Sequence, residues 1–124
     1  MNCSDLFSLK KRNALIIGGA GLLGSQISEV LAEFGSNVIV ASRNNINGIN
    51  FVKKLKNKFK NINVNFVEVD INNPKSIISM SQKISNLTNN RLDILVNCGW
   101  SGNLPFSKLV SLIYTLNNTY FSYS

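Results

Sequence analysis

Apolar residues in this chain occur in two patterns, short apolar segments and longer stretches in which they recur at helical spacing. An unbroken run falls at residues 14–17, and segments that are mainly apolar but contain one or two polar residues fall at 37–41, 64–69 and 92–96. Runs of this kind are typical of parallel strands that are covered on both faces. Because a stretch with helical spacing separates each run from the next, the pattern predicts an α/β fold. We expect a parallel sheet of about four strands with helices on both of its faces.

Each helical stretch predicts a buried stripe. The first ends at Gly35, and its expected stripe on the sheet consists of Ile27, Val30, Leu31 and Phe34. The second has a core face formed by Phe51, Val52, Leu55 and Phe59. Its solvent-facing side is expected to carry Lys53, Lys54, Lys56, Lys58 and Lys60. The third begins at Pro74, and one of its faces follows Ile77, Ser81, Ile84 and either Leu87 or Thr88. A last helix is expected from about Ser107.

Glycines follow the first apolar run at once. Two spacings fit, G-x-G-x-x-G for Gly19, Gly21 and Gly24, and G-x-x-G-x-x-G for Gly18, Gly21 and Gly24. The first glycine permits a tight turn, Gly21 lets a pyrophosphate approach the main chain, and Gly24 allows close packing of helix and strand. The free N–H groups of the following helix suit a diphosphate. A glycine turn between a strand and a helix predicts a dinucleotide-binding, Rossmann-like doubly wound sheet.

The end of the second strand indicates which nucleotide is bound. NAD-binding units place Asp or Glu there for the ribose hydroxyls, whereas this chain has Ser42 and Arg43. A guanidinium pairs with a 2′-phosphate and a carboxylate repels it, so the sequence favours NADP over NAD. The alternative is that Arg43 is a solvated residue at a strand exit.

The predicted topology places several of these residues together. Successive right-handed crossovers put the early strands side by side and then reverse direction, so that the carboxyl ends of the first and fourth strands flank a crevice. The rim of this crevice is expected to hold the glycine turn at residues 18–24 together with Ser42, Arg43, Asp70 and Asn97. The alternative for Asp70 is that it only caps the turn after the third strand.

Composition excludes several classes of function. The net charge is +7, but the lysines form the wet face of one helix and no nucleic-acid module accompanies them, so we expect no nucleic-acid partner. No apolar run is long enough to span a bilayer, and residues 1–12 have no signal-peptide pattern, which favours a cytoplasmic protein without a membrane partner. With no histidine and two cysteines, neither a metal site nor a disulfide framework is expected. Length favours one domain at residues 13–124 after a leader at 1–12.

These motifs resemble the short-chain dehydrogenase/reductase family over nearly the whole chain. Ile17 stands at the threonine of the family's glycine turn, Asp70 and Ile71 resemble its adenine-contacting pair, and residues 93–97 resemble the strand that leads into its Asn-Asn-Ala-Gly. The resemblance implies that Leu22 and Leu23 lie near the nicotinamide half of the cofactor, and the main chain of Asn97, Cys98 and Gly99 near its ribose. Trp100 replaces the glycine of that motif.

The family's catalytic Tyr-x-x-x-Lys pair is missing, because Tyr114, Tyr120 and Tyr123 have no lysine four residues later. No catalytic residue is therefore assigned. We expect the NADP-preferring cofactor-binding portion of an oxidoreductase, truncated before the catalytic segment. The intact enzyme would act on a small-molecule substrate, and association into a homo-oligomer is left open. The alternatives are a non-catalytic NADP(H)-binding or regulatory module, or a fragment of an extended-type sugar epimerase or dehydratase.

Overall fold

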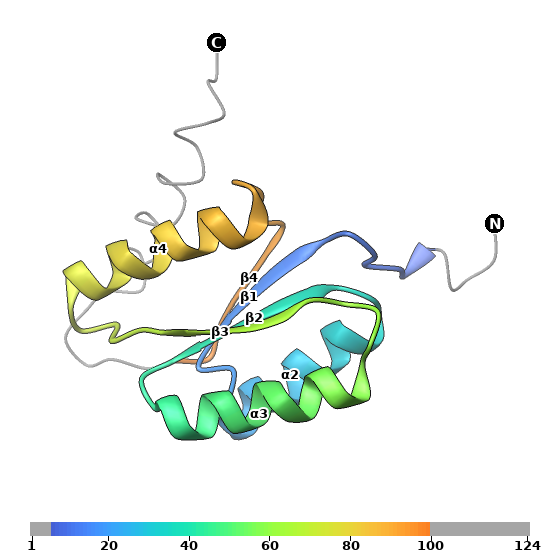
Figure 1. Ribbon diagram of the computed structural model, residues 1–124, viewed down its shortest axis with the longest axis horizontal. Coiled ribbons are helices and arrows are strands. Elements are labelled where there is room, and N and C mark those ends of the chain that lie inside the picture. Colours follow the sequence, from blue (N-terminus) through green and yellow to red (C-terminus); the bar gives the residue numbers. More distant parts are fainter. Residues whose placement is uncertain (1–5, 100–124) are drawn as a thin grey trace, which may run out of the picture.

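The four strands form a single parallel sheet with the order β3-β2-β1-β4 (Figure 1). The structure is a computed structural model that describes residues 6–99 of the 124-residue chain. The strands are β1 (Asn13–Ile17), β2 (Asn37–Ser42), β3 (Val64–Glu68) and β4 (Ile94–Asn97). The predicted strand order is confirmed, and β4 begins two residues later than the apolar run indicates.

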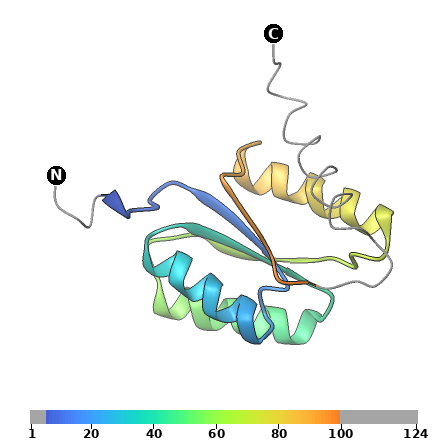
Figure 2. The same cartoon turned by 180° about the vertical axis from the view of Figure 1, so that it is seen from behind.

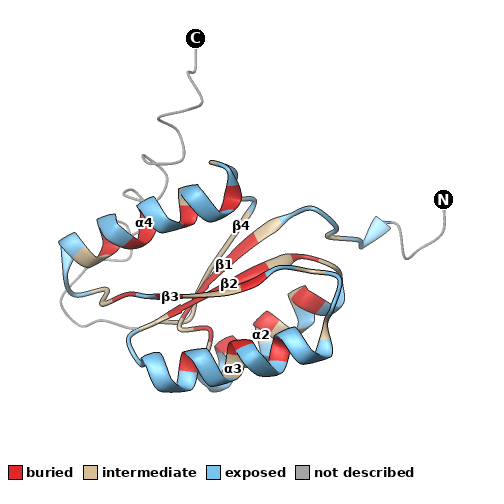
Figure 3. Cartoon of the chain, in the orientation of Figure 1, coloured by how far each residue is buried: buried red, intermediate tan, exposed pale blue. Residues whose placement is uncertain are grey.

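Helices cover both faces of the sheet, as predicted. Helices α2 (Leu22–Glu33) and α3 (Asn45–Lys58) lie on one face, and α4 (Pro74–Thr88) lies on the other (Figures 1 and 2). The strands separate two apolar cores, since alternate strand residues point to opposite faces. Leu15 and Ile17 pack toward α4, whereas Ala14 and Ile16 pack toward α2 and α3. All four are at most 1% exposed, and Figure 3 shows buried residues along the strands and the inner sides of the helices.

The buried stripe predicted for α2 is wrong in part. Val30 and Phe34 are 49% and 46% exposed. The face that is buried carries small residues instead, Gly24, Ser28 and Ala32, with Ile27 and Leu31 packed beside them. Small side chains at i, i+4 and i+8 bring the helix close to the strands, and apolar periodicity does not detect them because they carry little hydrophobicity. Gly35 ends the helix as predicted, with φ +97° and its N–H bonded to the Ala32 oxygen.

The other two helices follow their predicted faces with small differences. Helix α3 ends at Lys58 with Phe59 as its C-cap, so Lys60 lies beyond it. On α4 the buried position is Thr88 rather than Leu87, which is 48% exposed. Thr88 can be buried because its hydroxyl donates to the Ile84 carbonyl oxygen at 2.7 Å. Met80, which the sequence analysis did not include, is fully buried.

The chain before β1 contacts the domain. The Leu9 N–H donates to the Phe34 oxygen at 2.8 Å, and the Arg12 oxygen accepts from the Asn37 N–H at 2.9 Å. Between residues 6 and 99 no helix has the length and apolarity needed to cross a membrane. The expectations for residues 1–5, for Trp100, for the helix from Ser107 and for the three tyrosines lie outside the described residues.

Candidate functional site

A cavity of about 570 Å³ opens at the carboxyl ends of the strands. Its lining residues come from three segments that are far apart in the sequence: Gly18, Gly21, Ser42, Arg43, Asn44 and Cys98. The ends of β1, β2 and β4 are brought together because Ile17 pairs with Ala41 on one side and with Asn97 on the other. The structure therefore places the glycine turn, Ser42 and Arg43 around one hollow.

Gly18 makes the turn that leaves β1. Its φ is +75°, and its N–H donates to the Ala41 oxygen at 2.7 Å. A Cβ at this position would lie 2.9 Å from the carbonyl carbon of Cys98, so the close approach of the β4 end also requires glycine. Gly19 does not have a positive φ. A Cβ on Gly19 would nevertheless lie 2.9 Å from the Ile16 oxygen, so the turn requires glycine at both positions and is compatible with both spacings.

The start of α2 faces this turn. Gly21 is the N-cap residue, no side chain of the described part of the chain caps it, and the first turn of α2 contains no acidic residue. The amide groups at this end are therefore without a side-chain acceptor, and together with the helix dipole they favour an anion. Leu22 and Leu23 follow directly and are 85% and 61% exposed. Neither leucine lines the cavity.

Gly24 brings α2 against the glycine turn. A Cβ there would lie 2.0 Å from the Gly18 oxygen and 2.8 Å from the Cα of Gly19. The close packing expected for this glycine is confirmed, although its partner is the backbone of the turn rather than the strand. The amide end of the helix is held beside the cavity by this contact.

Ser42, Arg43 and Asn44 form the second wall of the cavity. The Ser42 hydroxyl donates to the Asn44 main-chain oxygen at 3.3 Å. Arg43 is exposed and has no ion pair among the described residues. Asn44 caps α3, because its side-chain oxygen accepts the Asn47 N–H at 3.1 Å. The guanidinium therefore remains available for a ligand anion.

Asn44 is the lining residue that the sequence analysis missed. The signal for it was the Asn-Asn pair at positions 44 and 45, because asparagine is a preferred N-cap residue. The apolar pattern of α3 is clear only from Phe51 onward, whereas the helix begins at Asn45. Its polar first turn therefore hid the cap.

The end of β4 forms the third wall. Cys98 is a free cysteine that lines the cavity, and its N–H donates to the Ile17 oxygen at 2.7 Å. The side-chain oxygen of Asn97 accepts the Gly99 N–H at 3.0 Å, so this side chain holds the turn after the strand. A Cβ on Gly99 would lie 3.2 Å from Ile17 Cγ2. Asn97 and Gly99 thus support the wall without lining the cavity.

Asp70 does not line the cavity either, and its polar groups bond to the following turn and to the start of α4. Its side-chain oxygen accepts the Asn72 N–H at 3.0 Å, and its N–H donates to the Ser76 hydroxyl at 2.9 Å. These are the contacts of a turn cap, the alternative raised for this residue. Ile71 packs against the core on the α4 side. Among residues 6–99 no group of three or more Asp, Glu, Cys or His residues is placed to hold a metal ion.

Comparison with known protein families finds one match that covers most of the chain. Residues 12–111 match the family model described as short chain dehydrogenase. Sorbose reductase from Schizosaccharomyces pombe is 27% identical over 93 residues, which are 75% of this chain and 36% of that protein. Salutaridine reductase from Papaver bracteatum is 33% identical over 88 residues, which are 71% of this chain and 28% of that protein. The chain thus spans about a third of the length of these curated relatives.

Solved structures show the same fold. The L-sorbose reductase from Gluconobacter frateurii, solved in complex with NADPH and L-sorbose, superposes with a TM-score of 0.73 at 21% identity. The match covers 91% of this chain and 47% of that one. At this level of identity the likeness establishes the architecture.

Proposed function

Because this chain belongs to the short-chain dehydrogenase family, we propose that it is the NADP-preferring cofactor-binding portion of an oxidoreductase. Within this proposal, residues 13–124 form the dinucleotide-binding domain. The intact enzyme exchanges hydride between the nicotinamide and a carbonyl or alcohol carbon of a small-molecule substrate, a reaction in which the cofactor supplies the redox chemistry. The names of the two curated relatives, both reductases, and the NADPH in the similar solved structure support the proposal.

The observation that carries the proposal is the set of residues that line the cavity. It joins a glycine turn that a side chain would obstruct to an arginine that has no ion pair within residues 6–99, and none of the residues of that range that line it is acidic. In this assignment the amides at the start of α2 hold the diphosphate. Arg43 pairs with the 2′-phosphate, and Ser42 and Asn44 lie beside it.

The remaining assigned contacts are part of the same proposal and rest on the family resemblance. Gly19 and Gly24 shape the turn, and Leu22 and Leu23 lie toward the nicotinamide. Asp70 and Ile71 lie toward the adenine. Asn97, Cys98 and Gly99 lie toward the ribose of the nicotinamide half. NAD binds more weakly in this proposal because it lacks the phosphate that Arg43 recognises.

The test is calorimetric titration of the full chain with NADPH and with NADH. Arg43→Ala is expected to weaken NADPH binding by about ten- to a hundredfold, the size of one lost charge-assisted pair, and to leave NADH binding unchanged. Lys53→Ala, which removes an exposed cation of α3 outside the cavity, is the matched control. An equal loss for both nucleotides, or an unchanged NADPH affinity, would contradict the assignment of Arg43.

A further inference from the structure

A second cavity lies at the opposite end of α3 from Arg43 and Asn44. Its volume is about 290 Å³, and it is formed by the last turn of α3, the loop that follows and the start of β3. Helix α3 has 14 residues, so its two ends are about 20 Å apart. The two cavities share no lining residue. The second one is therefore separate from the candidate cofactor site.

This cavity follows the edge of β3 rather than one face of the sheet. Asn63, Val64 and Asn65 line it in succession. Val64 belongs to the core on the α2 and α3 side, so the alternation of a strand directs Asn65 to the opposite face. Because residues of both faces line one cavity, the cavity wraps around the strand's edge.

The backbone of this edge is available for pairing. Among the described strands β3 pairs with β2 alone. The Asn63 oxygen accepts from the Val38 N–H at 2.9 Å, and the Val69 N–H donates to the Ser42 oxygen at 3.0 Å, so the odd-numbered positions face β2. Since the main-chain groups of successive strand residues point to opposite sides, those of Val64 and Phe66 point outward from the sheet. Outward groups of this kind bind an added strand.

The surroundings of the edge are positively charged. Lys56 and Lys60 line the cavity, neither has an ion pair among the described residues, and no lining residue is acidic. Lys58 lies between them in sequence, but it is bound to Glu29, and that hydrogen bond raises its pKa. Glu68, the carboxylate of β3, lies at the far end of the strand and accepts from Asn45 at 3.0 Å.

We propose that this edge of β3 binds an extended acidic peptide segment of a partner protein. The segment adds a strand to the sheet through the outward main-chain groups of Val64 and Phe66. Its carboxylates pair with the amines of Lys56 and Lys60, and Phe59 and Ile62 supply the apolar wall against which its other side chains pack. A peptide fits this surface better than a nucleic acid, because the cavity follows a strand and offers a row of main-chain donors and acceptors.

The charge requirement can be tested by fluorescence anisotropy with the full chain and a labelled peptide of alternating glutamate and valine. The double variant K56E/K60E is expected to weaken binding by about tenfold or more at low salt. The control K53E/K54E changes the net charge of the chain by the same amount at two positions outside the cavity, and it is expected to change affinity by less than about threefold. Equal losses in the two variants, or tighter binding of a single-stranded oligonucleotide of the same charge, would overturn the proposal.

The backbone requirement can be tested on the unaltered protein. Two versions of the peptide carry backbone N-methyl groups on alternate residues. One version is methylated at the odd-numbered residues and the other at the even-numbered residues, so that only one of them blocks the N–H groups that face β3. If the peptide pairs with β3, methylation of the inward-facing phase abolishes binding and methylation of the other phase is tolerated. Binding that survives methylation in both phases would exclude strand addition. The NADPH affinity of the K56E/K60E variant is expected to be unchanged. This measurement does not involve the peptide, and it shows whether the variant is folded.

Discussion

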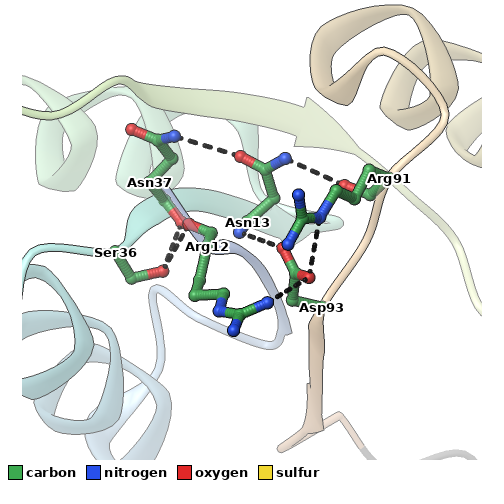
Figure 4. Close-up of polar contacts among 6 residues, drawn as sticks. All are labelled: Arg12, Asn13, Ser36, Asn37, Arg91 and Asp93. Atoms are coloured by element: carbon green, nitrogen blue, oxygen red, sulfur yellow. Dashed lines mark hydrogen bonds and ion pairs between the residues drawn. The ribbon is translucent and has the colours of Figure 1, made fainter. Parts of the chain in front are cut away.

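The side-chain amides of Asn13 and Asn37 are hydrogen-bonded across the first residues of β1 and β2, with Asn37 Nδ2 donating to Asn13 Oδ1 at 3.1 Å (Figure 4). Each amide also bonds to the segment that leads into the next strand outward. Asn37 Oδ1 accepts the Asn63 N–H at 3.0 Å, and Asn13 Nδ2 donates to the Arg91 oxygen at 2.9 Å. One row of side-chain amides thus links the first residues of β1 and β2 to the segments that lead into β3 and β4, at the end of the sheet opposite the cavity lined by Gly18 and Arg43.

Replacing Asn37 by Ala is expected to lower the free energy of unfolding by about 1–2 kcal/mol, because Asn13 loses a part-buried hydrogen bond and the Asn63 N–H loses an exposed one. Urea unfolding measures the loss. In the double variant N13A/N37A the loss should be smaller than the sum of the single losses, since the shared bond is counted twice. Asn57→Ala on the exposed side of α3 is the control. Strictly additive losses would show that the Asn13–Asn37 bond contributes nothing.

Asp93 joins the start of β4 to the start of β1. Its carboxylate accepts the Asn13 N–H at 2.8 Å and lies 3.1 Å from Arg91 Nε and 3.4 Å from Arg12. Burial of the side chain, which is 15% exposed, raises the pKa of Asp93. The hydrogen bond from Asn13 and the two guanidinium groups outweigh this effect, so the pKa lies below its ordinary value of 3.8.

The lowered pKa predicts a pH-dependent effect of Asp93→Asn. A carboxylate with a lowered folded-state pKa contributes stability that is present above the unfolded pKa and is lost as the pH falls through the folded value. The variant should therefore be less stable than the natural chain at neutral pH, by about 1–3 kcal/mol. The difference should shrink below the ordinary pKa of 3.8. Urea unfolding at several pH values checks this, and a difference that does not change with pH would contradict it.

The hydroxyl of Ser28 is buried and has no hydrogen-bond partner. Among the residues that the structure describes, it is the one buried side-chain polar atom of this kind. Its side chain is fully buried between α2 and the sheet. Ser28→Ala should raise the free energy of unfolding by about 1 kcal/mol, because a hydroxyl without a partner is removed from the core. Ser81→Ala is the matched control on α4, where the hydroxyl donates to the Ile77 oxygen at 2.9 Å. A gain in stability from both substitutions would assign the effect to helix propensity instead.

Two glycines of the turn should respond differently to alanine. Gly24→Ala places a Cβ 2.0 Å from the Gly18 oxygen, so the start of α2 must shift, and we expect a loss of stability of about 3 kcal/mol or more. At Gly21 the nearest atom is the same oxygen at 3.3 Å, which requires only a small adjustment. Gly21 lines the cavity, so Gly21→Ala should keep most of the stability and weaken NADPH binding. Thermal unfolding and calorimetry separate the two, and equal losses of stability would contradict this prediction.

Much of the candidate site was predictable because its residues carry local signals. The glycine spacing and the buried strand before it predicted the turn, and the parallel topology placed Ser42 and Arg43 beside it, where the cavity now has them. The assignment of Asp70 to the adenine stays a prediction, and the structure shows its groups bonded to Asn72 and to Ser76 of α4. The number of donors around one carboxylate depends on a loop conformation that a sequence pattern does not specify.

The sequence by itself determined the types of the elements, their order and the parallel sheet, because apolar periodicity, glycine and proline act within a few residues. Only the tertiary structure decided which side of α2 faces the strands, since close packing through Gly24, Ser28 and Ala32 leaves no hydrophobic pattern. It also decided that Asn44 lines the cavity. At the amino ends of the strands, away from the cavity, it placed Asn13, Asn37 and Asp93 so that they bond to one another. These contacts join residues that are distant in sequence, and their geometry exists only once the strands lie side by side.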